Sequence, residues 1–212
     1  MKENTKTDMQ PITLLKPAFD RCTTVFEALS TRRTSRTIGG KPIPLQALSD
    51  ILWAAQGVNR AEGPFGDQGR TAGSASNSQE IYVYVAVKEG TYLYEPGPHC
   101  LAPVVSGDIR ALAIGRGQAP AGADAPVRLI YIVDLDRFNY AGFQEPGLHD
   151  PEIQKSYYFV DTGLIAQNVY VAAASLGLAA WFHNCNRAAL GEKLDLKPHQ
   201  RALFGQTIGY EE

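Results

Sequence analysis

One stretch of the sequence is long and almost free of charge, and it limits what the chain can fold into. Residues 157–178 contain a single charged side chain, Asp161. A helix of this length is long enough to span a bilayer. Thr162, Gln167, Asn168 and Ser175 interrupt the run, however, and no basic cluster flanks it. We therefore predict a buried helix over 157–176. Since a chain of 212 residues rarely surrounds such a helix alone, the stretch also predicts a partner subunit.

The composition narrows the class of protein further. Hydrophobic residues make up 44% of the chain and charged residues 20%, which excludes disorder, collagen and coiled coil. The net charge of −2 is unlike that of a nucleic-acid-binding domain, so no nucleic acid and no membrane partner is expected. The length suits one domain. We expect an extended N-terminal arm over 1–22 and a single domain over 23–212.

The cysteines and histidines give no sign of a metal site or a disulfide framework. Three cysteines and four histidines are widely spaced, and no pair has ligand spacing. The first residues lack the apolar core of a signal peptide, so a cytoplasmic location is expected for this chain. A longer natural precursor with an export signal stays compatible with the sequence.

The hydrophobic pattern predicts interleaved helices and strands without a regular βαβ repeat, that is, an α+β fold. Expected helices are 26–33, 45–58, 107–114, 157–176 and 187–194, and expected strands are 81–87, 92–94, 127–133, 179–182 and 203–208. The irregular segment 134–154 is long enough to be a lid or binding loop. Its aromatic residues Phe138, Tyr140 and Phe143 are candidates for a substrate pocket.

The first candidate binding segment is rich in arginine and hydroxyl groups. It contains Arg32 and Arg33 at the end of a predicted helix, followed directly by Thr34 and Arg36. Arginine forks match phosphate oxygens, and hydroxyls add short hydrogen bonds. A solvated basic turn explains the spacing equally well.

A second candidate is the run of small and amide residues Gly73 to Gln79. Small residues let a ligand approach the backbone, and Asn77 and Gln79 offer donors and acceptors to a heterocycle. A plain flexible loop is the competing interpretation. A third segment, 181–187, has no nucleophile–base pattern, and the sequence contains neither a P-loop nor a Rossmann fingerprint.

Taken together and in order, these segments resemble the nitroreductase family of flavin enzymes, in particular a short single-domain branch related to azoline-oxidase-type dehydrogenases. The resemblance covers residues 25–210 and rests on ALSTRRTSRTI (28–38), LSDILWAAQGVNR (48–60), RTAGSASNSQEIYVYV (70–85), DTGLIAQNVYVAAASLGLAAW (161–181) and QTIGY (206–210). Each motif is weak alone, and their common order carries the identification.

The resemblance implies an FMN-binding α+β fold with a mixed central sheet flanked by helices, in an intertwined homodimer. Two active sites would lie at the dimer interface. NADH or NADPH would reduce the flavin, which carries the chemistry, and a small-molecule acceptor would then take the electrons. No catalytic side chain is required. The long buried helix would become the dimer helix.

The resemblance also assigns residues to the flavin. Arg32, Arg33 and Thr34 would hold the phosphate, and Arg36 would lie near the phosphate or the N1/O2 edge. The remaining positions implied to contact flavin are Ser74, Ala75 and Ser76 from the second subunit, Asn77 and Gln79 beside the pyrimidine ring, Phe182, His183 and Asn184 near N5 and O4, and Arg187 as an extra phosphate contact.

The sequence departs from the family pattern at three places. Gly73 stands where many relatives have Pro, and His183 where many have Gly. Longer relatives carry a cation for the phosphate after the position of Tyr210. Here Arg32, Arg33 and Arg187 would supply that charge.

The sequence therefore predicts an FMN-dependent oxidoreductase that passes hydride from NAD(P)H to a nitroaromatic, quinone or similar conjugated acceptor. Two alternatives stay open. One is an FMN-dependent dehydrogenase or oxidase of azoline-oxidase type, which needs no nicotinamide. The other is a flavin-binding redox protein without turnover.

Overall fold

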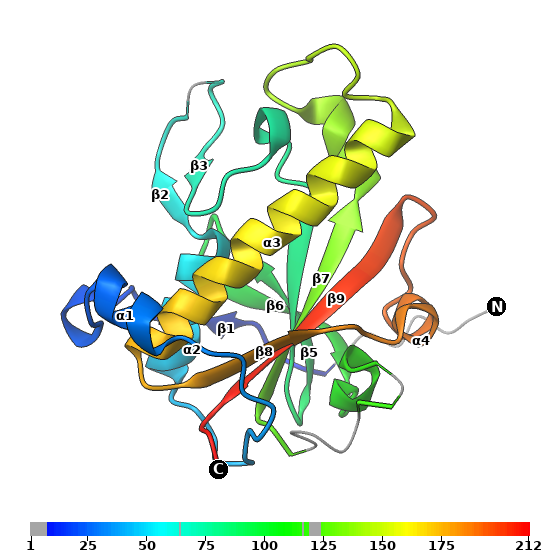
Figure 1. The fold of residues 1–212 in the computed structure, drawn as a ribbon. Helices are drawn as coiled ribbons and strands as arrows, with labels where there is room; N and C mark the ends of the chain where they lie inside the picture. The colour runs from blue at the N-terminus through cyan, green and yellow to red at the C-terminus, as the bar shows by residue number, and fades with distance from the viewer. Residues whose placement is uncertain (1–7, 64, 116, 119–123) are drawn as a thin grey trace.

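The computed structural model describes residues 8–63, 65–115, 117–118 and 124–212, and its centre is a seven-stranded sheet (Figure 1). The strands of this sheet are β1 (Ile12–Thr13), β4 (Ile81–Ala86), β5 (Gly90–Glu95), β6 (Cys100–Ser106), β7 (Val127–Asp134), β8 (Ala179–His183) and β9 (Gln200–Gly209). They lie in the order β1-β6-β5-β4-β7-β9-β8. Two further strands, β2 (Val58–Arg60) and β3 (Gly69–Arg70), form a separate hairpin.

The helices interleave with the strands along the chain, and the α+β class is confirmed. The α-helices are α1 (Val25–Thr31), α2 (Leu45–Gln56), α3 (Pro151–Ser175) and α4 (Arg187–Lys193), and short 3-10 helices cover Phe19–Arg21, Ala75–Asn77, Arg110–Ala113 and Leu135–Tyr140. All pairs of neighbouring strands in the described sheet are antiparallel, where a mixed sheet was expected. A single parallel bridge joins Thr34 to Ala180 at the β8 edge.

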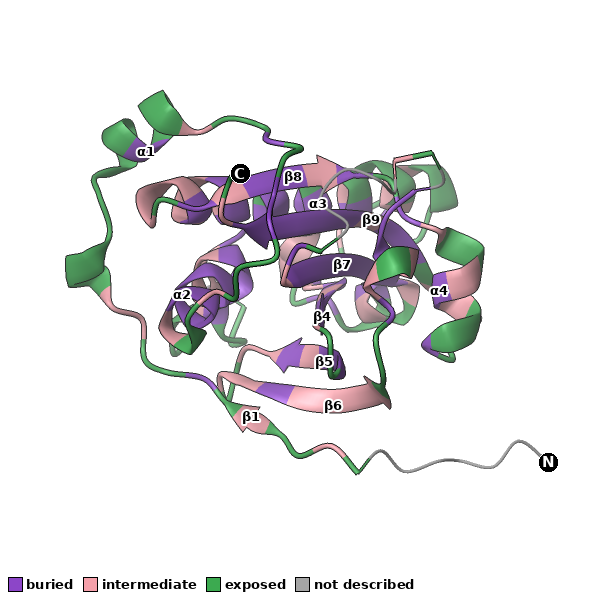
Figure 2. Ribbon diagram, turned by 90° about the horizontal axis from the view of Figure 1, so that it is seen from below, coloured by how far each residue is buried: buried purple, intermediate pink, exposed green. Residues whose placement is uncertain are grey.

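Helices cover both faces of the sheet, which explains why β7 is buried along its whole length. Alternate residues of a strand point to opposite faces. Leu129 and Tyr131 pack in the larger core with residues of α2 and α3. Ile130 and Ile132 pack on the other face with Leu190 of α4. In Figure 2, β7 and β9 are accordingly coloured as buried, whereas α1 is largely exposed.

The long helix predicted at 157–176 is present, and it begins six residues earlier. Asp150 caps it by accepting a hydrogen bond from Glu152 N at 2.8 Å, and Pro151 occupies the first turn. It is not buried on all sides within one chain: Phe159, Val160 and Leu164 are 40%, 60% and 46% exposed. No helix in the described part of the chain has the length and hydropathy to cross a membrane.

The helix expected over 107–114 is wrong. A 3-10 turn at Arg110–Ala113 stands in its place, after strand β6 ends at Ser106. Strand β6 itself was missed, because its pairing with β5 and β1 is set by tertiary contacts and not by local pattern. Through that pairing, Ile12–Thr13 of the arm joins the sheet, and Leu14 enters the core.

Candidate functional site

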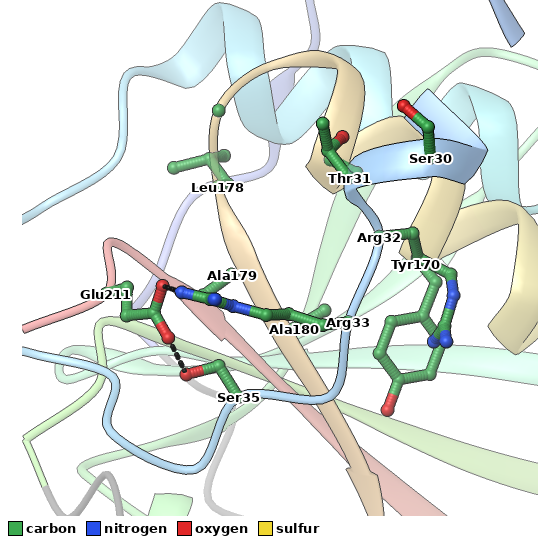
Figure 3. Close-up of a pocket in the computed structure, with 12 residues that line it drawn as sticks. Ser30, Thr31, Arg32, Arg33, Ser35, Tyr170, Leu178, Ala179, Ala180 and Glu211 are labelled. Atoms are coloured by element: carbon green, nitrogen blue, oxygen red, sulfur yellow. Dashed lines mark hydrogen bonds and ion pairs between the residues drawn. The ribbon is translucent and has the colours of Figure 1, made fainter. Parts of the chain in front are cut away.

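A cavity of about 580 Å³ lies where the end of α1 meets α3 and β8 (Figure 3). Its lining combines two guanidinium groups with several hydroxyls. The lining residues are Ser30, Thr31, Arg32, Arg33, Ser35, Tyr170, Ala174, Gly177, Leu178, Ala179, Ala180 and Glu211. The structure thus brings Arg32 and Arg33, singled out from the sequence, into one pocket.

The backbone after α1 is fixed against the sheet. Arg32 N closes the helix by donating to Ala28 O at 2.8 Å. Thr34 then forms the parallel bridge with Ala180, and Ser35 N donates to Ala180 O at 3.1 Å. These contacts hold an extended strand-like segment, so that Arg33 and Ser35 lie on the same side of it.

Tyr170 of α3 organises the inner wall of the cavity. Its hydroxyl accepts a hydrogen bond from Phe182 N at 2.8 Å and lies 3.1 Å from Thr34 Oγ1. The Arg32 guanidinium lies over its ring at 5.0 Å from the centroid. Sequence reasoning did not identify Tyr170 as a site residue. The available signal was weak: a buried hydroxyl needs a partner, but Tyr170 is one of three tyrosines in this helix.

Among the described residues that line the cavity, Glu211 is the one acidic side chain. Its carboxylate forms an ion pair with Arg33 and accepts a hydrogen bond from Ser35 Oγ at 2.8 Å. Both hydrogen bonds stabilise the charged form, so they lower the pKa of Glu211. No pattern in the sequence marked this residue.

Arg36 does not line this cavity. Its guanidinium lies 5.6 Å from the ring centroid of Trp181, and its side chain is exposed. Arg187 is also elsewhere: its Nε and Nη2 donate to Leu203 O at 3.1 and 2.8 Å, beside a second cavity near Phe159.

The Gly73–Gln79 segment packs against α3 more than two helical turns before Tyr170. Ala75 N donates to Asp161 Oδ2 at 2.9 Å, and Gln79 N donates to Ser74 Oγ at 3.0 Å. Ser76, Asn77 and Gln79 have positive φ angles of 51°, 55° and 52°. Three non-glycine residues in the left-handed region are costly, and such conformations persist only where surroundings impose them.

Two buried acids, Glu80 and Asp161, accept hydrogen bonds from this segment. Glu80 Oε2 accepts a hydrogen bond from Ser78 Oγ at 2.7 Å, and its carboxyl group contacts that of Asp161. Burial, reinforced by the charge of Asp161, raises the pKa of Glu80 to about 8. Burial also raises the pKa of Asp161. A proton shared between the two acids supplies the donor that Glu80 Oε1 otherwise lacks among the described groups.

The amides predicted to meet a heterocycle are largely used within the loop. Gln79 Oε1 accepts from Arg70 Nε at 2.9 Å, and Gln79 Nε2 donates to Gln68 O at 2.8 Å. Asn77 Oδ1 accepts from Gln79 Nε2 at 3.1 Å. Asn77 Nδ2 is buried and has no partner among the described residues. Among the described contacts, it is the amide group of Asn77 and Gln79 that stays unused, and in one chain it is not exposed to solvent.

Several polar groups at the end of β8 are used within the protein, including the Phe182 N–H, which donates to Tyr170. His183 is buried, and its Nδ1 donates to Asn184 O at 2.9 Å while Nε2 accepts from Thr207 Oγ1 at 2.8 Å. Burial lowers the pKa of His183 to about 4, so the ring is neutral near pH 7. Phe182 packs on Phe204 with ring centroids 4.8 Å apart, and the Asn184 side chain is exposed.

The three aromatic candidates for a substrate pocket differ in burial. Phe138 is completely buried with Ala141 and Leu148, so it faces the protein interior. Tyr140 and Phe143 are 74% and 52% exposed. Phe143 stacks on Phe65 of the 59–80 segment at 6.0 Å between centroids. Only Tyr140 and Phe143 are accessible to a ligand in one chain.

A group of possible metal ligands occurs at the end of β7, although the sequence led us to expect no metal site. Ligand atoms of Asp134, Asp136 and His199 lie within 4.8 Å of one another. Both Asp134 oxygens already accept hydrogen bonds, from Asp136 N at 3.1 Å and from Gln200 Nε2 at 2.8 Å. These hydrogen bonds account for the cluster without a metal ion: Asp134 caps the 3-10 helix Leu135–Tyr140, and His199 lies beside it.

Comparisons with known proteins agree on one family. The sequence model of the Nitroreductase family matches residues 29–210. A protein of Methanocaldococcus jannaschii, provisionally named a nitroreductase, is 30% identical over 163 residues, which are 72% of this chain and 74% of that protein.

Solved structures have the same fold. A provisionally named nitroreductase of Ralstonia eutropha superposes with a TM-score of 0.81 at 30% identity, over 98% of this chain and 92% of that chain. A chain of the microcin synthetase McbBCD complex of E. coli, solved with truncated pro-MccB17 bound, gives a TM-score of 0.69 at 15% identity. That match covers 99% of this chain and 79% of the other, and at this identity it shows the fold alone.

Proposed function

Because this chain belongs to the nitroreductase family, we propose that it is an FMN-dependent oxidoreductase that takes hydride from NADH or NADPH. The electrons would pass to a nitroaromatic, a quinone or a related conjugated acceptor. The observation that carries the proposal is the cavity of about 580 Å³ between α1, α3 and β8, in which Arg32 and Arg33 meet hydroxyl groups.

The donor set of this cavity fits a phosphate monoester. Arginine forks and hydroxyls bind phosphate oxygens by charge-assisted hydrogen bonds. Arg33 is 71% exposed at its side chain, and Arg32 is held over Tyr170, so both are within reach of an anion that enters the cavity. We assign the FMN phosphate to Arg32 and Arg33, with Thr34 nearby.

The remaining assignments concern the flavin ring. Arg36 would neutralise charge at N1/O2, and the partner's copies of Ser74, Ala75 and Ser76 would contact the ring. Asn77 and Gln79 would lie beside the pyrimidine ring, where Asn77 Nδ2 is a donor without a partner among the described residues. At the end of β8, Phe182, His183 and Asn184 would lie near N5 and O4, although the Phe182 N–H and the His183 ring are already hydrogen-bonded within the protein.

When bound, FMN supplies the redox chemistry, accepting hydride from the nicotinamide and returning the electrons to the acceptor. The protein's part is to bind, orient and exclude water. Arg36 supplies a fixed positive charge. The neutral His183 ring holds the β8–β9 contact and moves no proton near pH 7.

We further propose a homodimer that forms through α3 and α1. Phe159, Val160 and Leu164 leave an apolar stripe exposed on α3, and Val25 and Phe26 of α1 are 63% and 85% exposed. Exposed apolar side chains that lie together on one helix, as these three of α3 do, are typical of a protein–protein interface. By the family resemblance, the Gly73–Gln79 segment of one subunit would contact the flavin held in the arginine cavity of the other.

A second candidate function is substrate dehydrogenation without a nicotinamide. This alternative follows from the resemblance of the sequence motifs to azoline-oxidase-type dehydrogenases. An absorbance spectrum of the purified protein, taken before and after anaerobic addition of NADH or NADPH, separates the two. Flavin bands bleached by a nicotinamide support the reductase. Flavin that neither donor bleaches supports the dehydrogenase or a carrier, and protein that takes up no FMN refutes the flavin assignment.

A further inference from the structure

The arginine cavity already contains an anion that belongs to the chain. Figure 3 shows the Glu211 carboxylate facing the Arg33 guanidinium and the Ser35 hydroxyl. One carboxylate oxygen pairs with Arg33, and the other accepts from Ser35 Oγ at 2.8 Å. Arg33 and Ser35 are therefore engaged before any external anion arrives, whereas the Arg32 guanidinium lies against Tyr170.

The position of Glu211 is set by paired backbone. Glu211 forms an antiparallel bridge with Ile38, Gly39 N donates to Tyr210 O at 2.9 Å, and Glu212 N donates to Thr37 O at 3.0 Å. The carboxylate is thus presented to Arg33 by a backbone that is anchored on both sides. Its placement is a property of the fold.

The pair is also weak enough to exchange. The Arg33 and Glu211 side chains are 71% and 37% exposed, and exposed ion pairs contribute little free energy because water and salt screen them. A phosphate monoester offers more charge and more acceptor oxygens than a carboxylate to the same donors. It can therefore take them from Glu211.

We propose that Glu211 is a built-in competitor of the ligand phosphate: its carboxylate occupies Arg33 and Ser35 in the empty cavity and must leave them when a phosphate-bearing ligand binds. The inference rests on the proposed FMN site. Glu211 then determines how tightly this chain holds FMN relative to flavins that lack the phosphate, and the cofactor is held in exchangeable form.

The test compares Glu211→Gln with wild type in titrations of flavin-free protein by FMN and by riboflavin, followed by flavin fluorescence. We expect Glu211→Gln to bind FMN about 3- to 10-fold more tightly, with riboflavin affinity unchanged. The matched control is Glu212→Gln, which removes the same charge from a neighbour that does not line the cavity. It should leave both affinities within about 2-fold.

Two other results of the flavin titrations overturn the inference, and a third moves the test to inorganic phosphate. FMN affinity that is unchanged or weaker in Glu211→Gln means that the carboxylate does not compete. An equal gain for riboflavin means that the effect is not at the phosphate. If wild type and variant both fail to bind either flavin, the proposed function fails, and Glu211 is then tested with inorganic phosphate. Greater thermal stabilisation of Glu211→Gln than of wild type by phosphate supports the competitor, and equal stabilisation refutes it.

Discussion

The hydroxyl of Tyr170 accepts a hydrogen bond from the backbone N–H of Phe182 at 2.8 Å and so links strand β8 to helix α3. The same hydroxyl lies 3.1 Å from Thr34 Oγ1. One side chain therefore connects three segments that form the wall of the cavity.

Replacing Tyr170 with Phe removes that connection and leaves the Phe182 N–H buried without an acceptor. We expect the free energy of unfolding to fall by about 1–3 kcal/mol, the cost of an unsatisfied buried donor. Urea denaturation measures it. Tyr140→Phe, at a side chain that is 74% exposed, is the control and should change stability by less than about 0.5 kcal/mol. Equal free energies of unfolding in both variants would show that the Tyr170 hydroxyl does not contribute to stability.

Arg32→Ala is expected to weaken FMN binding by about 10- to 100-fold, because a hydrogen bond to a charged group contributes about 1.5–3 kcal/mol. Riboflavin affinity should stay the same, since it has no phosphate. Arg21→Ala removes the same charge from the exposed Phe19–Arg21 turn and serves as control. Unchanged FMN affinity in Arg32→Ala would contradict the phosphate assignment.

Arg36→Ala is expected to lower the midpoint potential of the bound flavin by tens of millivolts, since about 30 mV corresponds to 1.4 kcal/mol for a two-electron couple. The reason is the loss of a positive charge that favours the reduced, negatively charged ring. Arg36→Lys keeps the charge and should keep the potential near that of wild type. Reduction against a reference dye measures both, and identical potentials in all three proteins would remove Arg36 from the flavin site.

Leu164→Asp is expected to convert a dimer into a folded monomer. Leu164 is 46% exposed in one chain, so a charge there costs little in the monomer and much in an apolar interface. Sedimentation reports the mass, and circular dichroism reports the fold. Ala111→Asp, on the exposed 3-10 turn at the opposite face of the sheet, should stay dimeric. A dimeric Leu164→Asp protein would place the interface elsewhere. Val169 on the same helix is completely buried, so a charge there unfolds the chain and tests nothing about association.

The free energy of unfolding of Glu80→Gln is expected to increase relative to that of wild type as the pH rises from 5 to 8. The native state keeps Glu80 protonated up to a pKa of about 8, whereas the unfolded state releases that proton near 4.5. The native state thus binds more protons in this window, and wild-type stability falls with rising pH by up to about 1.4 kcal/mol per pH unit. Gln carries no such proton. Glu152→Gln, at a side chain that is 84% exposed, is the control. A constant difference between Glu80→Gln and wild type from pH 5 to 8 would mean that Glu80 is charged in the folded protein.

The elements that local pattern determines were predictable. Ile81–Ala86 and Val127–Asp134 are runs of β-branched and aromatic residues, and both are central strands. The long α3 follows from its lack of charge. Strand β6 was not predictable, because its residues have no clear alternation and its pairing is made by β5 and β1.

The residues of the candidate site also fall into those that local sequence could predict and those that it could not. Arg32 and Arg33 could be found from their spacing, since both are neighbours in sequence and in the cavity. Their partners could not, because Tyr170 and Glu211 lie 136 and 176 positions from the hydroxyls of Thr34 and Ser35 that they contact. His183 was assigned to the flavin, yet its ring faces Thr207 inside the sheet, a direction that strand pairing alone decides.

Both edges of the sheet are covered by short extended segments, Ile12–Thr13 on β6 and Thr34–Ser35 on β8. Open edges are the places where sheets of separate molecules join into aggregates. Pairing with these segments uses part of the backbone hydrogen-bonding groups of β6 and β8, so less of each strand is open to a strand from a neighbouring molecule. Deleting residues 8–16 would uncover β6, and such a shortened chain should precipitate at concentrations at which the intact chain stays dispersed.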